Sequence, residues 1–386
     1  MSRRKICVVT GARSEYGLLA PVMAAILDSA DFTLQVAATG AHLSPEFGRT
    51  VDVLVADGFV PDERVEMLLS SDTALGMATS LGLGVMGLAG AFERLAPDLV
   101  FLLGDRYETL AAGLAAATLG LPLAHCAGGD LTLGAVDDVY RHCLTKMAHA
   151  HFPTNADAAA RIRQMGEDPA RIHLVGSPGL DALRTTPRLS RDELARELDF
   201  AWREKNLLVT FHPETLERRP STELFAELLA ALEALGPDLG LIFTLPGADA
   251  QGRALIAMTE DFCASRPQAK AYTSLGQKRY LSAAALVDAV VGNSSSGLYE
   301  VPSLGTATVN IGDRQKGRPQ AASVVSCPHE RGAILEAVRR AMALDCSGVV
   351  NPYGDGRSAA RIVAALEAIP DFKALSPKTF HPLEGA

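Results

Sequence analysis

Short apolar runs alternate with helix-like segments along this chain, most plainly between Leu99 and Phe152. An apolar run at Leu99–Leu103 stops at Gly104, and an Ala-rich helical segment separates it from a second run at Leu121–Ala124. A further helix is expected to open at Asp137. This alternation is typical of a parallel sheet with helices on both faces.

The alternation occurs twice, and a polar interval separates its two parts. It breaks after Val175 and restarts at Leu207, and the interval includes Leu183–Arg191, with two threonines, a proline and a serine. Such a composition favours a linker. A chain of 386 residues is also long enough for two domains. We therefore expect two doubly wound α/β domains. Their expected bounds are 1–180, joined by a C-terminal helix within 357–386, and 181–356.

Charge and hydropathy narrow the possible partners. The net charge is −9 and the isoelectric point is near 5.5, so the chain lacks the basic excess that nucleic acids and anionic membranes attract. The apolar segment Leu81–Ala91 is glycine-rich and shorter than the roughly 18 residues that span a bilayer. We expect no membrane segment and no nucleic-acid partner. A negatively charged ligand would need a local basic pocket.

The cysteines indicate a reduced compartment. There are six of them, scattered, with no CxxC pair and no ligand spacing. The N-terminus is basic, but its apolar run is only a few residues long and lacks a cleavable small-residue site. We expect a cytoplasmic enzyme without disulfides, structural zinc or another metal centre.

Ionisable side chains follow the ends of two neighbouring predicted strands. Ligands of open parallel sheets bind at the carboxyl ends of the strands, and crowded ionisable groups shift one another's pKa. This set therefore favours proton-transfer chemistry. Its members are Asp105, Asp130, Asp137, His125, Arg106 and Arg141. The simpler interpretation is that Asp137 and Asp138 cap a helix and that Arg106 pairs with Glu108 in solvent.

The first predicted strand, Lys5–Thr10, runs into the loop Gly11–Gly17. The loop lacks the GxGxxG spacing of a nicotinamide-binding fingerprint. Its amides would still suit a phosphate at the start of the following helix, and Arg13 could add a bidentate contact. The alternative is that Arg13 is an ordinary surface arginine.

A second polar loop, Gly292–Gly297, joins another predicted strand to a helix. Its members Asn293, Ser294, Ser295 and Ser296 supply hydroxyls and amides suited to phosphate oxygens, and a helix dipole would add attraction. Glu300 suits ribose hydroxyls, as acidic residues do in dinucleotide sites. Local positive charge comes from Arg314, Lys316 and Arg318. The alternative is a loop that only caps the helix.

His212 ends the first strand of the second half, immediately before Pro213. The proline keeps its backbone extended. An imidazole titrates near neutrality, so His212 could protonate or bind a departing phosphate. A lone histidine is more often structural.

Seven motifs spread over residues 10 to about 359 resemble those of the hydrolysing UDP-N-acetylglucosamine 2-epimerases of sialic and legionaminic acid pathways. In chain order they are TGARSEYGLLAPVM, LGDRYETLAA, HCAGGDLTLGAVDDVYRHCLTKMAHAHF, FHPE, GNSSSGLYE, NIGDRQKGR and NPYGDGRSA. Each is weak alone, and the set in this order is highly specific.

The resemblance implies a GT-B architecture, in which two Rossmann-like domains hold the active site in the cleft between them. It also implies that UDP is eliminated across carbons 1 and 2 to give a 2-acetamidoglucal, to which water then adds. UDP-N-acetylglucosamine would yield N-acetylmannosamine and UDP. No cofactor is implied, and the assembly would be a homodimer or homotetramer.

The resemblance also assigns residues. Asp105, Asp137, Arg141 and His212 match catalytic positions, whereas Arg13, Ser294, Ser295, Glu300 and Arg314 match nucleotide-binding positions. Arg106 lies in a matching motif, and Asp249 is a weaker match near the base or ribose. Several members carry an acidic or polar residue where this chain has Ala127. Asp130 would then have taken that role, or the reaction would differ.

Four alternatives stay open. The same reaction could act on a UDP- or GDP-linked 2,4-diacetamido-2,4,6-trideoxyhexose. A non-hydrolysing epimerase would return UDP-N-acetylmannosamine. A GT-B glycosyltransferase or an inactive nucleotide-sugar sensor would share the fold.

Overall fold

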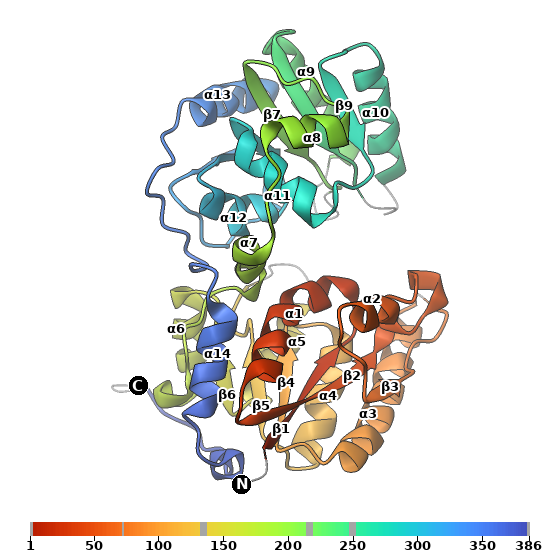
Figure 1. Ribbon diagram of the computed structural model, residues 1–386, viewed down its shortest axis with the longest axis vertical. Coiled ribbons are helices and arrows are strands. Elements are labelled where there is room, and N and C mark those ends of the chain that lie inside the picture. Colours follow the sequence, from red (N-terminus) through yellow and green to blue (C-terminus); the bar gives the residue numbers. More distant parts are fainter. Residues whose placement is uncertain (1–2, 72, 132–136, 214–218, 247–251, 384–386) are drawn as a thin grey trace. The chain divides into compact units, whose positions relative to one another are not determined.

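The computed structural model describes residues 3–71, 73–131, 137–213, 219–246 and 252–383. The chain forms two compact units, and each is described by itself. Unit 1 comprises Met1–Asp181 and Tyr353–Ala386, and unit 2 comprises Ala182–Pro352. The C-terminal helix therefore returns to the N-terminal unit, where it packs against α1 (Figure 1).

Unit 1 is built on a six-stranded parallel sheet in the order β3-β2-β1-β4-β5-β6. Its strands are β1 Arg4–Thr10, β2 Phe32–Thr39, β3 Glu63–Val65, β4 Leu99–Leu103, β5 Leu123–Cys126 and β6 Ala150–Phe152. Its helices are α1 Arg13–Asp28, α2 Val51–Ala56, α3 Ala74–Leu95, α4 Tyr107–Thr118, α5 Asp137–Met147, α6 Ala156–Gln164 and α14 Ser358–Glu367, and α7 Asp181–Thr185 lies at the boundary.

Unit 2 repeats this plan with the order β12-β11-β10-β7-β8-β9, again all parallel. Its strands are β7 Lys205–Thr210, β8 Leu239–Thr244, β9 Ala269–Tyr272, β10 Ala289–Gly292, β11 Ala307–Ile311 and β12 Val324–Cys327. Its helices are α8 Arg191–Leu198, α9 Ser221–Ala234, α10 Gly252–Ala264, α11 Gly276–Leu286, α12 Ser296–Tyr299 and α13 Arg331–Met342.

Helices cover both faces of each sheet because successive strand side chains point to opposite faces. In β4, Phe101 packs in the core shared with α1 and α14, whereas Val100 and Leu102 pack in the core shared with α3, α4 and α5. In unit 2, Val209 of β7 packs with α9, α10 and α13, and Leu208 packs with α8 and α11. The predicted doubly wound class is confirmed.

Several predicted bounds are wrong. Helix α1 begins at Arg13, inside the expected loop Gly11–Gly17, and the segment before the break at Val175 contains only an isolated bridge between Ile172 and β6. The expected linker begins within α7, whose first residue Asp181 caps α14 by accepting the amides of Ser358 and Ala359 at 2.9 and 2.7 Å. These contacts span about half the chain, which local sequence patterns do not reveal.

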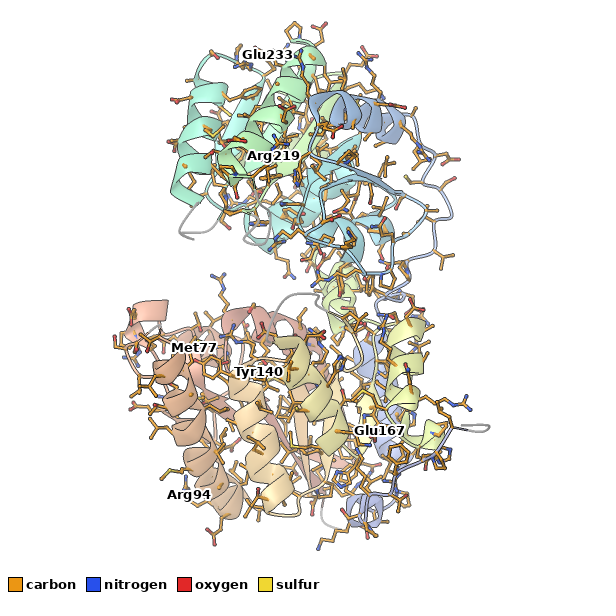
Figure 2. The ribbon with its side chains drawn as sticks, turned by 180° about the vertical axis from the view of Figure 1, so that it is seen from behind. Met77, Arg94, Tyr140, Glu167, Arg219 and Glu233 are labelled. Atoms are coloured by element: carbon orange, nitrogen blue, oxygen red, sulfur yellow. The ribbon has the colours of Figure 1, made fainter. Side chains whose placement is uncertain are left out.

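Helix α3 is longer than the apolar interval Leu81–Ala91 on which the membrane expectation rests. It has 22 residues, with a mean hydropathy of 1.5 over its most apolar 18, so it is long and apolar enough to cross a bilayer. One such helix is weak evidence, since a helix packed in a core passes the same test, and α3 packs against β4 and α4 in unit 1. The absence of a membrane segment stays a prediction. Met77 and Arg94 lie towards the two ends of this helix (Figure 2). The helix N-cap is Thr73, which accepts the amide of Gly76. Asp72, a plausible N-cap by residue type, lies outside the described residues.

Candidate active site

In both sheets the strand order reverses at a central pair, β1 and β4 in unit 1 and β7 and β10 in unit 2. Ligands of doubly wound sheets bind beyond the carboxyl ends of the strands at such points. Asp105 follows β4, while His212 and Asn293 follow β7 and β10. The structure therefore gives each unit one candidate half-site.

Arg141 of α5 joins the acidic groups of unit 1. Its Nη2 pairs with Oδ2 of Asp105, and its Nη1 donates to the backbone oxygen of Asp130 at 2.8 Å and to Oδ1 of Asp138 at 3.2 Å. Arg141 is only 6% exposed, and a buried guanidinium needs such partners. Arg141 thereby joins the side chains of Asp105 and Asp138 to the backbone of Asp130, and Asp137 at the start of α5 acts on Asp105 through its charge.

The pKa of Asp105 is raised above its ordinary value. Burial is the largest cause, and the negative charge of Asp137 adds to it, so together they outweigh the attraction of Arg141. A carboxylate with a raised pKa exchanges a proton near neutrality more readily than a free one. Asp105 and Asp137 therefore form a pair suited to proton transfer.

Asp130 is held by two neutral donors. Asn155 Nδ2 donates to Oδ1 of Asp130 at 2.8 Å, and Thr154 Oγ1 donates to its Oδ2 at 3.1 Å. Asn155 is also the N-cap of α6, because its Oδ1 accepts the amide of Ala158 at 2.9 Å. That cap fixes the orientation of the amide group and turns its NH₂ towards the carboxylate.

His125 has a structural role in unit 1. Its Nε2 lies 2.8 Å from the carbonyl oxygen of Gly104, and its Nδ1 lies 3.3 Å from Oγ1 of Thr145. Burial lowers the pKa of His125 to about 3, so the ring is neutral and Nε2 carries the proton. The neutral imidazole therefore connects the turn before Asp105 to α5 through hydrogen bonds and does not act as a general acid.

In the loop after β1, the amide of Gly11 is already hydrogen-bonded within unit 1. The amide of Gly11 donates to Oε2 of Glu15 at 2.8 Å, and Thr109 Oγ1 donates to Oε1 at 2.7 Å. Burial raises the pKa of Glu15 to about 7 against these two hydrogen bonds. The amide expected to face a phosphate is thus already bonded within unit 1. Arg13, the first residue of α1, is exposed.

Arg106 pairs with Glu108, as the simpler interpretation predicted, but the pair does not lie in solvent. Its Nη2 and Nε lie 2.8 and 3.1 Å from the two carboxylate oxygens of Glu108. Glu108 is only 1% exposed, so the pair is anchored in the interior and not in solvent. The partly exposed guanidinium remains accessible to a ligand.

In unit 2, Asn293 fixes the backbone of His212. Its Oδ1 accepts the amide of His212 at 2.7 Å, and its Nδ2 donates to the carbonyl of His212 at 2.9 Å. The two strands approach closely here because Gly292 has φ +141°, and a Cβ at that position would lie 1.8 Å from the oxygen of Thr210. Asn293 is fully buried and both ends of its amide group bond the backbone of His212, so its side chain positions the loop.

Glu300 is the least satisfied acid in the described part of unit 2. Burial raises its pKa to about 7 against a hydrogen bond from Ser296, whose Oγ also accepts the Tyr280 hydroxyl at 2.7 Å. Its buried Oε2 has no hydrogen-bond partner among the described residues. A buried acceptor without a donor is costly, so a hydroxyl donor at this place would be favourable.

The helix after this loop is shorter than expected. Helix α12 has four residues, Ser296–Tyr299, and continues as a 3₁₀ turn over Val301–Leu304. Pro302 lacks the amide that a longer helix would need. The helix dipole is therefore weaker than the sequence argument assumed, and the phosphate-binding potential rests on Ser294, Ser295 and the loop amides.

The three residues predicted to supply local positive charge, Arg314, Lys316 and Arg318, have different partners. Arg314 donates to the carbonyl of Asn293 at 3.1 Å, so it lies beside the polar loop. Lys316 pairs with Asp313 at 2.8 Å, and Arg318 donates to Gln315 at 2.5 Å.

Asp249 lies outside the described residues. Within the described ranges, no cluster of His, Cys, Asp or Glu is arranged to hold a metal ion.

Two groups of residues were missed by the sequence argument. Asn155 and Thr154 orient Asp130, and Gln315 donates to the carbonyl of Asn293 at 2.9 Å. Asn155 was recognised only as the start of a helix. Its second contact reaches across 25 residues, and no local pattern signals it.

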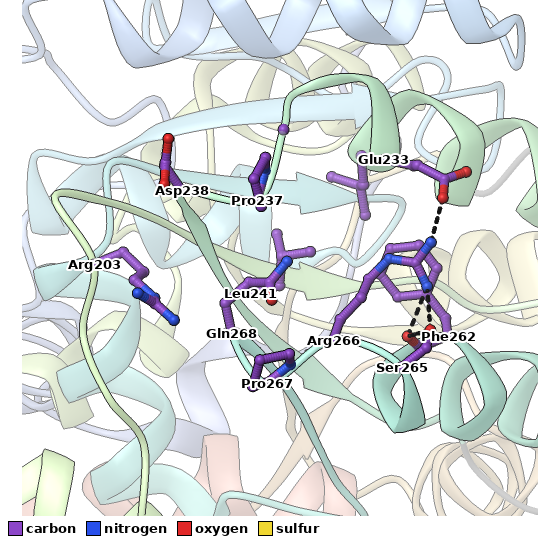
Figure 3. A pocket seen from close by; sticks show the side chains of 12 residues that line it. Arg203, Glu233, Pro237, Asp238, Leu241, Phe262, Ser265, Arg266, Pro267 and Gln268 are labelled. Atoms are coloured by element: carbon purple, nitrogen blue, oxygen red, sulfur yellow. Dashed lines mark hydrogen bonds and ion pairs between the residues drawn. The ribbon is translucent and has the colours of Figure 1, made fainter.

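A separate hollow of about 570 Å³ lies at the opposite edge of the unit 2 sheet, near the amino ends of β8 and β9 (Figure 3). Arg266 lies in its wall, pairs with Glu233 and Ser265, and stacks 3.9 Å over the ring of Phe262. These contacts already satisfy the guanidinium. The hollow is distinct from the candidate half-sites.

The two sheets, each with the strand order of a Rossmann fold, define a GT-B-like protein. The structure of S. aureus MnaA with UDP has this fold, with a TM-score of 0.77 and 18% identity over 98% of this chain and 100% of that one. The chain belongs to the UDP-N-acetylglucosamine 2-epimerase family, whose profile matches residues 24–367.

Two curated relatives support the same membership. GDP/UDP-N,N'-diacetylbacillosamine 2-epimerase (hydrolyzing) of Campylobacter jejuni is 37% identical over 84% of each chain. UDP-N,N'-diacetylbacillosamine 2-epimerase (hydrolyzing) of Legionella pneumophila is 33% identical over 95% of this chain and 96% of that protein.

Proposed function

We propose that this protein is a hydrolysing 2-epimerase of a nucleotide-linked 2-acetamido sugar. The observation that carries the proposal is the unit 1 network, in which buried Arg141 holds Asp105 beside Asp137 and also contacts Asp130. The names of the two curated relatives support the hydrolysing type of reaction.

Proton removal is the first task of the unit 1 carboxylates. The C2–H bond of the sugar breaks as one carboxylate takes the proton, a C1=C2 double bond forms, and the C1–O bond to the diphosphate breaks. The C2 proton is weakly acidic, so the base must be held in place. We assign this step to the pair Asp105 and Asp137, with Arg141 fixing Asp105.

Unit 2 would hold the nucleotide. Ser294 and Ser295 offer hydroxyls, Arg314 offers a cation, and His212 could protonate or bind the leaving diphosphate. Glu300 would accept hydrogen bonds from ribose hydroxyls, which its buried Oε2 lacks within the described protein. Arg13 and Arg106 would add positive charge near the phosphates.

Water addition completes the reaction. The oxygen of water bonds to C1 of the 2-acetamidoglucal, and a proton returns to C2 on the opposite face, which releases the free sugar with inverted C2. Asp130 would take part here in place of the acidic or polar side chain that Ala127 lacks. Its fixed contacts with Asn155 and Thr154 suit a positioned group.

The sugar has two candidates. The two curated relatives, at 37% and 33% identity, favour a donor that carries N,N'-diacetylbacillosamine. The motifs resemble those of enzymes that act on UDP-N-acetylglucosamine. Both donors carry the 2-acetamido group and the C2 proton that the proposed chemistry needs.

Proton NMR of the purified protein in deuterated water with each donor tests the proposal. We expect nucleoside diphosphate and a free sugar that carries deuterium at C2. A nucleotide-linked epimer would instead indicate the non-hydrolysing reaction. Nucleotide binding without turnover of either donor would contradict the proposal and favour a glycosyltransferase or a sensor.

We further propose a cytoplasmic homo-oligomer. All six cysteines, which lie in the described ranges, are free thiols, as a reducing compartment requires. Helix α3 exposes Leu75 and Met86 by 77% and 74%, and an exposed apolar helix face suits contact with a second copy. Sedimentation should show an assembly in the wild type and monomers in Leu75→Glu/Met86→Glu. A monomeric wild type that partitions into vesicles would refute the oligomer.

A further inference from the structure

The chain after α14 folds back onto the helix that carries Asp137 and Arg141. We call residues 376–383 the C-terminal strap. The amide of His381 donates to the carbonyl of Gly166 at 2.9 Å, and Lys146 lies 5.1 Å over the ring of Phe380. Although Phe380 is largely exposed, its ring also contacts Gly166, so the strap is fixed to unit 1.

Helix α5 ends without a local cap. It stops at Met147, β6 begins at Ala150, and the connection Ala148–His149 contains no glycine that could adopt the usual left-handed closing turn. The last carbonyls of a helix have no partners within it, and they form the negative end of its dipole. This end of α5 needs a donor from elsewhere in the chain.

Lys378 of the strap supplies that donor. Its Nζ lies 2.6 Å from the carbonyl oxygen of Lys146, 2.5 Å from that of Ala148 and 3.4 Å from that of Thr145. An ammonium group at this place satisfies the carbonyls and opposes the negative end of the dipole. The residue that closes α5 is thus more than 200 positions away in sequence.

Glu167 fixes the ammonium group in turn. Its Oε2 lies 2.6 Å from Lys378 Nζ and 2.9 Å from His151 Nε2, and its Oε1 accepts from Lys146 at 2.6 Å. Glu167 is 2% exposed and lies beyond the end of α6 (Figure 2). Burial would raise its pKa, but the bonds from His151, Lys146 and Lys378 lower it to about 2. The carboxylate is therefore ionised and holds both lysines.

We propose that Lys378 is a positioning residue for the reaction, because it fixes the far end of the helix that presents Asp137 and Arg141. The inference rests on the proposed function. Helix α5 has 11 residues and acts as one rigid element, so a shift at its end moves its first turn. Catalytic groups tolerate only small displacements before the rate falls.

Replacement of Lys378 tests the inference. We expect Lys378→Met to lower kcat by about ten- to a hundredfold, with KM and the Kd of UDP within about twofold of wild type. Lys378→Arg should recover most of the rate, since it keeps the cation. Lys373→Met, an exposed lysine of the same C-terminal region, is the matched control and should behave as wild type.

Hydrogen exchange separates this inference from the proposed function. Amides of α5 should exchange faster in Lys378→Met, whether or not the wild type turns over a sugar nucleotide. If Lys378→Met does not fold, Phe380→Ala loosens the strap more gently and should give a smaller effect of the same kind. Wild-type kcat together with wild-type exchange in α5 would overturn the inference, as would equal losses in kcat and nucleotide binding.

Discussion

Both units contain a buried glutamate whose pKa is raised to about 7, yet the two residues have different surroundings. Glu15 of unit 1 accepts hydrogen bonds on both oxygens, from Gly11 and Thr109. Glu300 of unit 2 has a buried Oε2 without a partner among the described residues. The pKa alone would make the two equivalent, whereas the hydrogen bonds separate them: Glu15 is satisfied within unit 1, and Glu300 keeps one oxygen for the proposed ligand.

The same contrast extends to the half-sites. In unit 1, the charged groups hold one another, as Arg141 holds Asp105 and Glu108 holds Arg106. Such contacts preorganise a site for chemistry. In unit 2, the polar loop offers donors and one unfilled acceptor, which suits binding. Substitutions in the two units should therefore separate turnover from nucleotide affinity.

The largest effect is expected in unit 1. Asp137→Asn and Asp105→Asn should each abolish measurable turnover, a loss of about a thousandfold or more, because the pair loses its proton acceptor. The Kd of UDP, measured by calorimetry, should stay nearly unchanged. Asp138→Asn, which loses a contact to Arg141 but no proposed catalytic carboxylate, is the control, and its turnover should fall only a few-fold. Turnover near wild type in either variant would reject the assigned roles.

A smaller effect, on binding, is expected in unit 2. Glu300→Gln should weaken UDP by about tenfold, because a charged acceptor for ribose hydroxyls is lost. The affinity for 2′-deoxy-UDP should change much less, so the variant should discriminate poorly between the two ligands. Glu330→Gln, an exposed acid of the same unit, serves as control. An equal loss of affinity for both ligands would show that Glu300 does not contact the ribose 2′-hydroxyl.

The third effect concerns the stability of unit 1 and leaves turnover and affinity unchanged. Since folding raises the pKa of Glu15 from 4.5 to about 7, the folded state keeps a proton that the unfolded chain releases in this window. The free energy of unfolding therefore falls as pH rises from 4.5 to 7, and Glu15→Gln should remove about 2 kcal/mol of that decline.

Thermal denaturation between pH 4.5 and 8 measures this difference. Exposed Glu93→Gln is the matched control and should keep the wild-type slope. Nucleotide affinity should be unaffected by Glu15→Gln. If the pH dependence of stability is unchanged in Glu15→Gln, or if its UDP binding falls as much as that of Glu300→Gln, the two glutamates do not differ in role.

Buried strands were predicted from sequence with good precision. The bounds of β4 agree with the apolar run Leu99–Leu103, and β1 begins one residue before the predicted Lys5–Thr10. Strand β12 and helices α8 and α13 were not anticipated. The four residues of β12, at an edge of the sheet, carry mixed burial and no continuous apolar pattern.

The sequence by itself determined the fold class and the types of residue that follow the central strands, because both depend on short-range patterns of hydropathy and on turns. It also predicted Asp105, Asp137 and Glu300 as site residues, which the substitutions above test. Only the tertiary structure decided which groups are already bonded: Gly11 to Glu15, Asp130 to Asn155, and Lys378 to the end of α5. The Asp130 and Lys378 bonds join residues far apart in the chain, and burial, which sets their strength, exists only after the chain has folded.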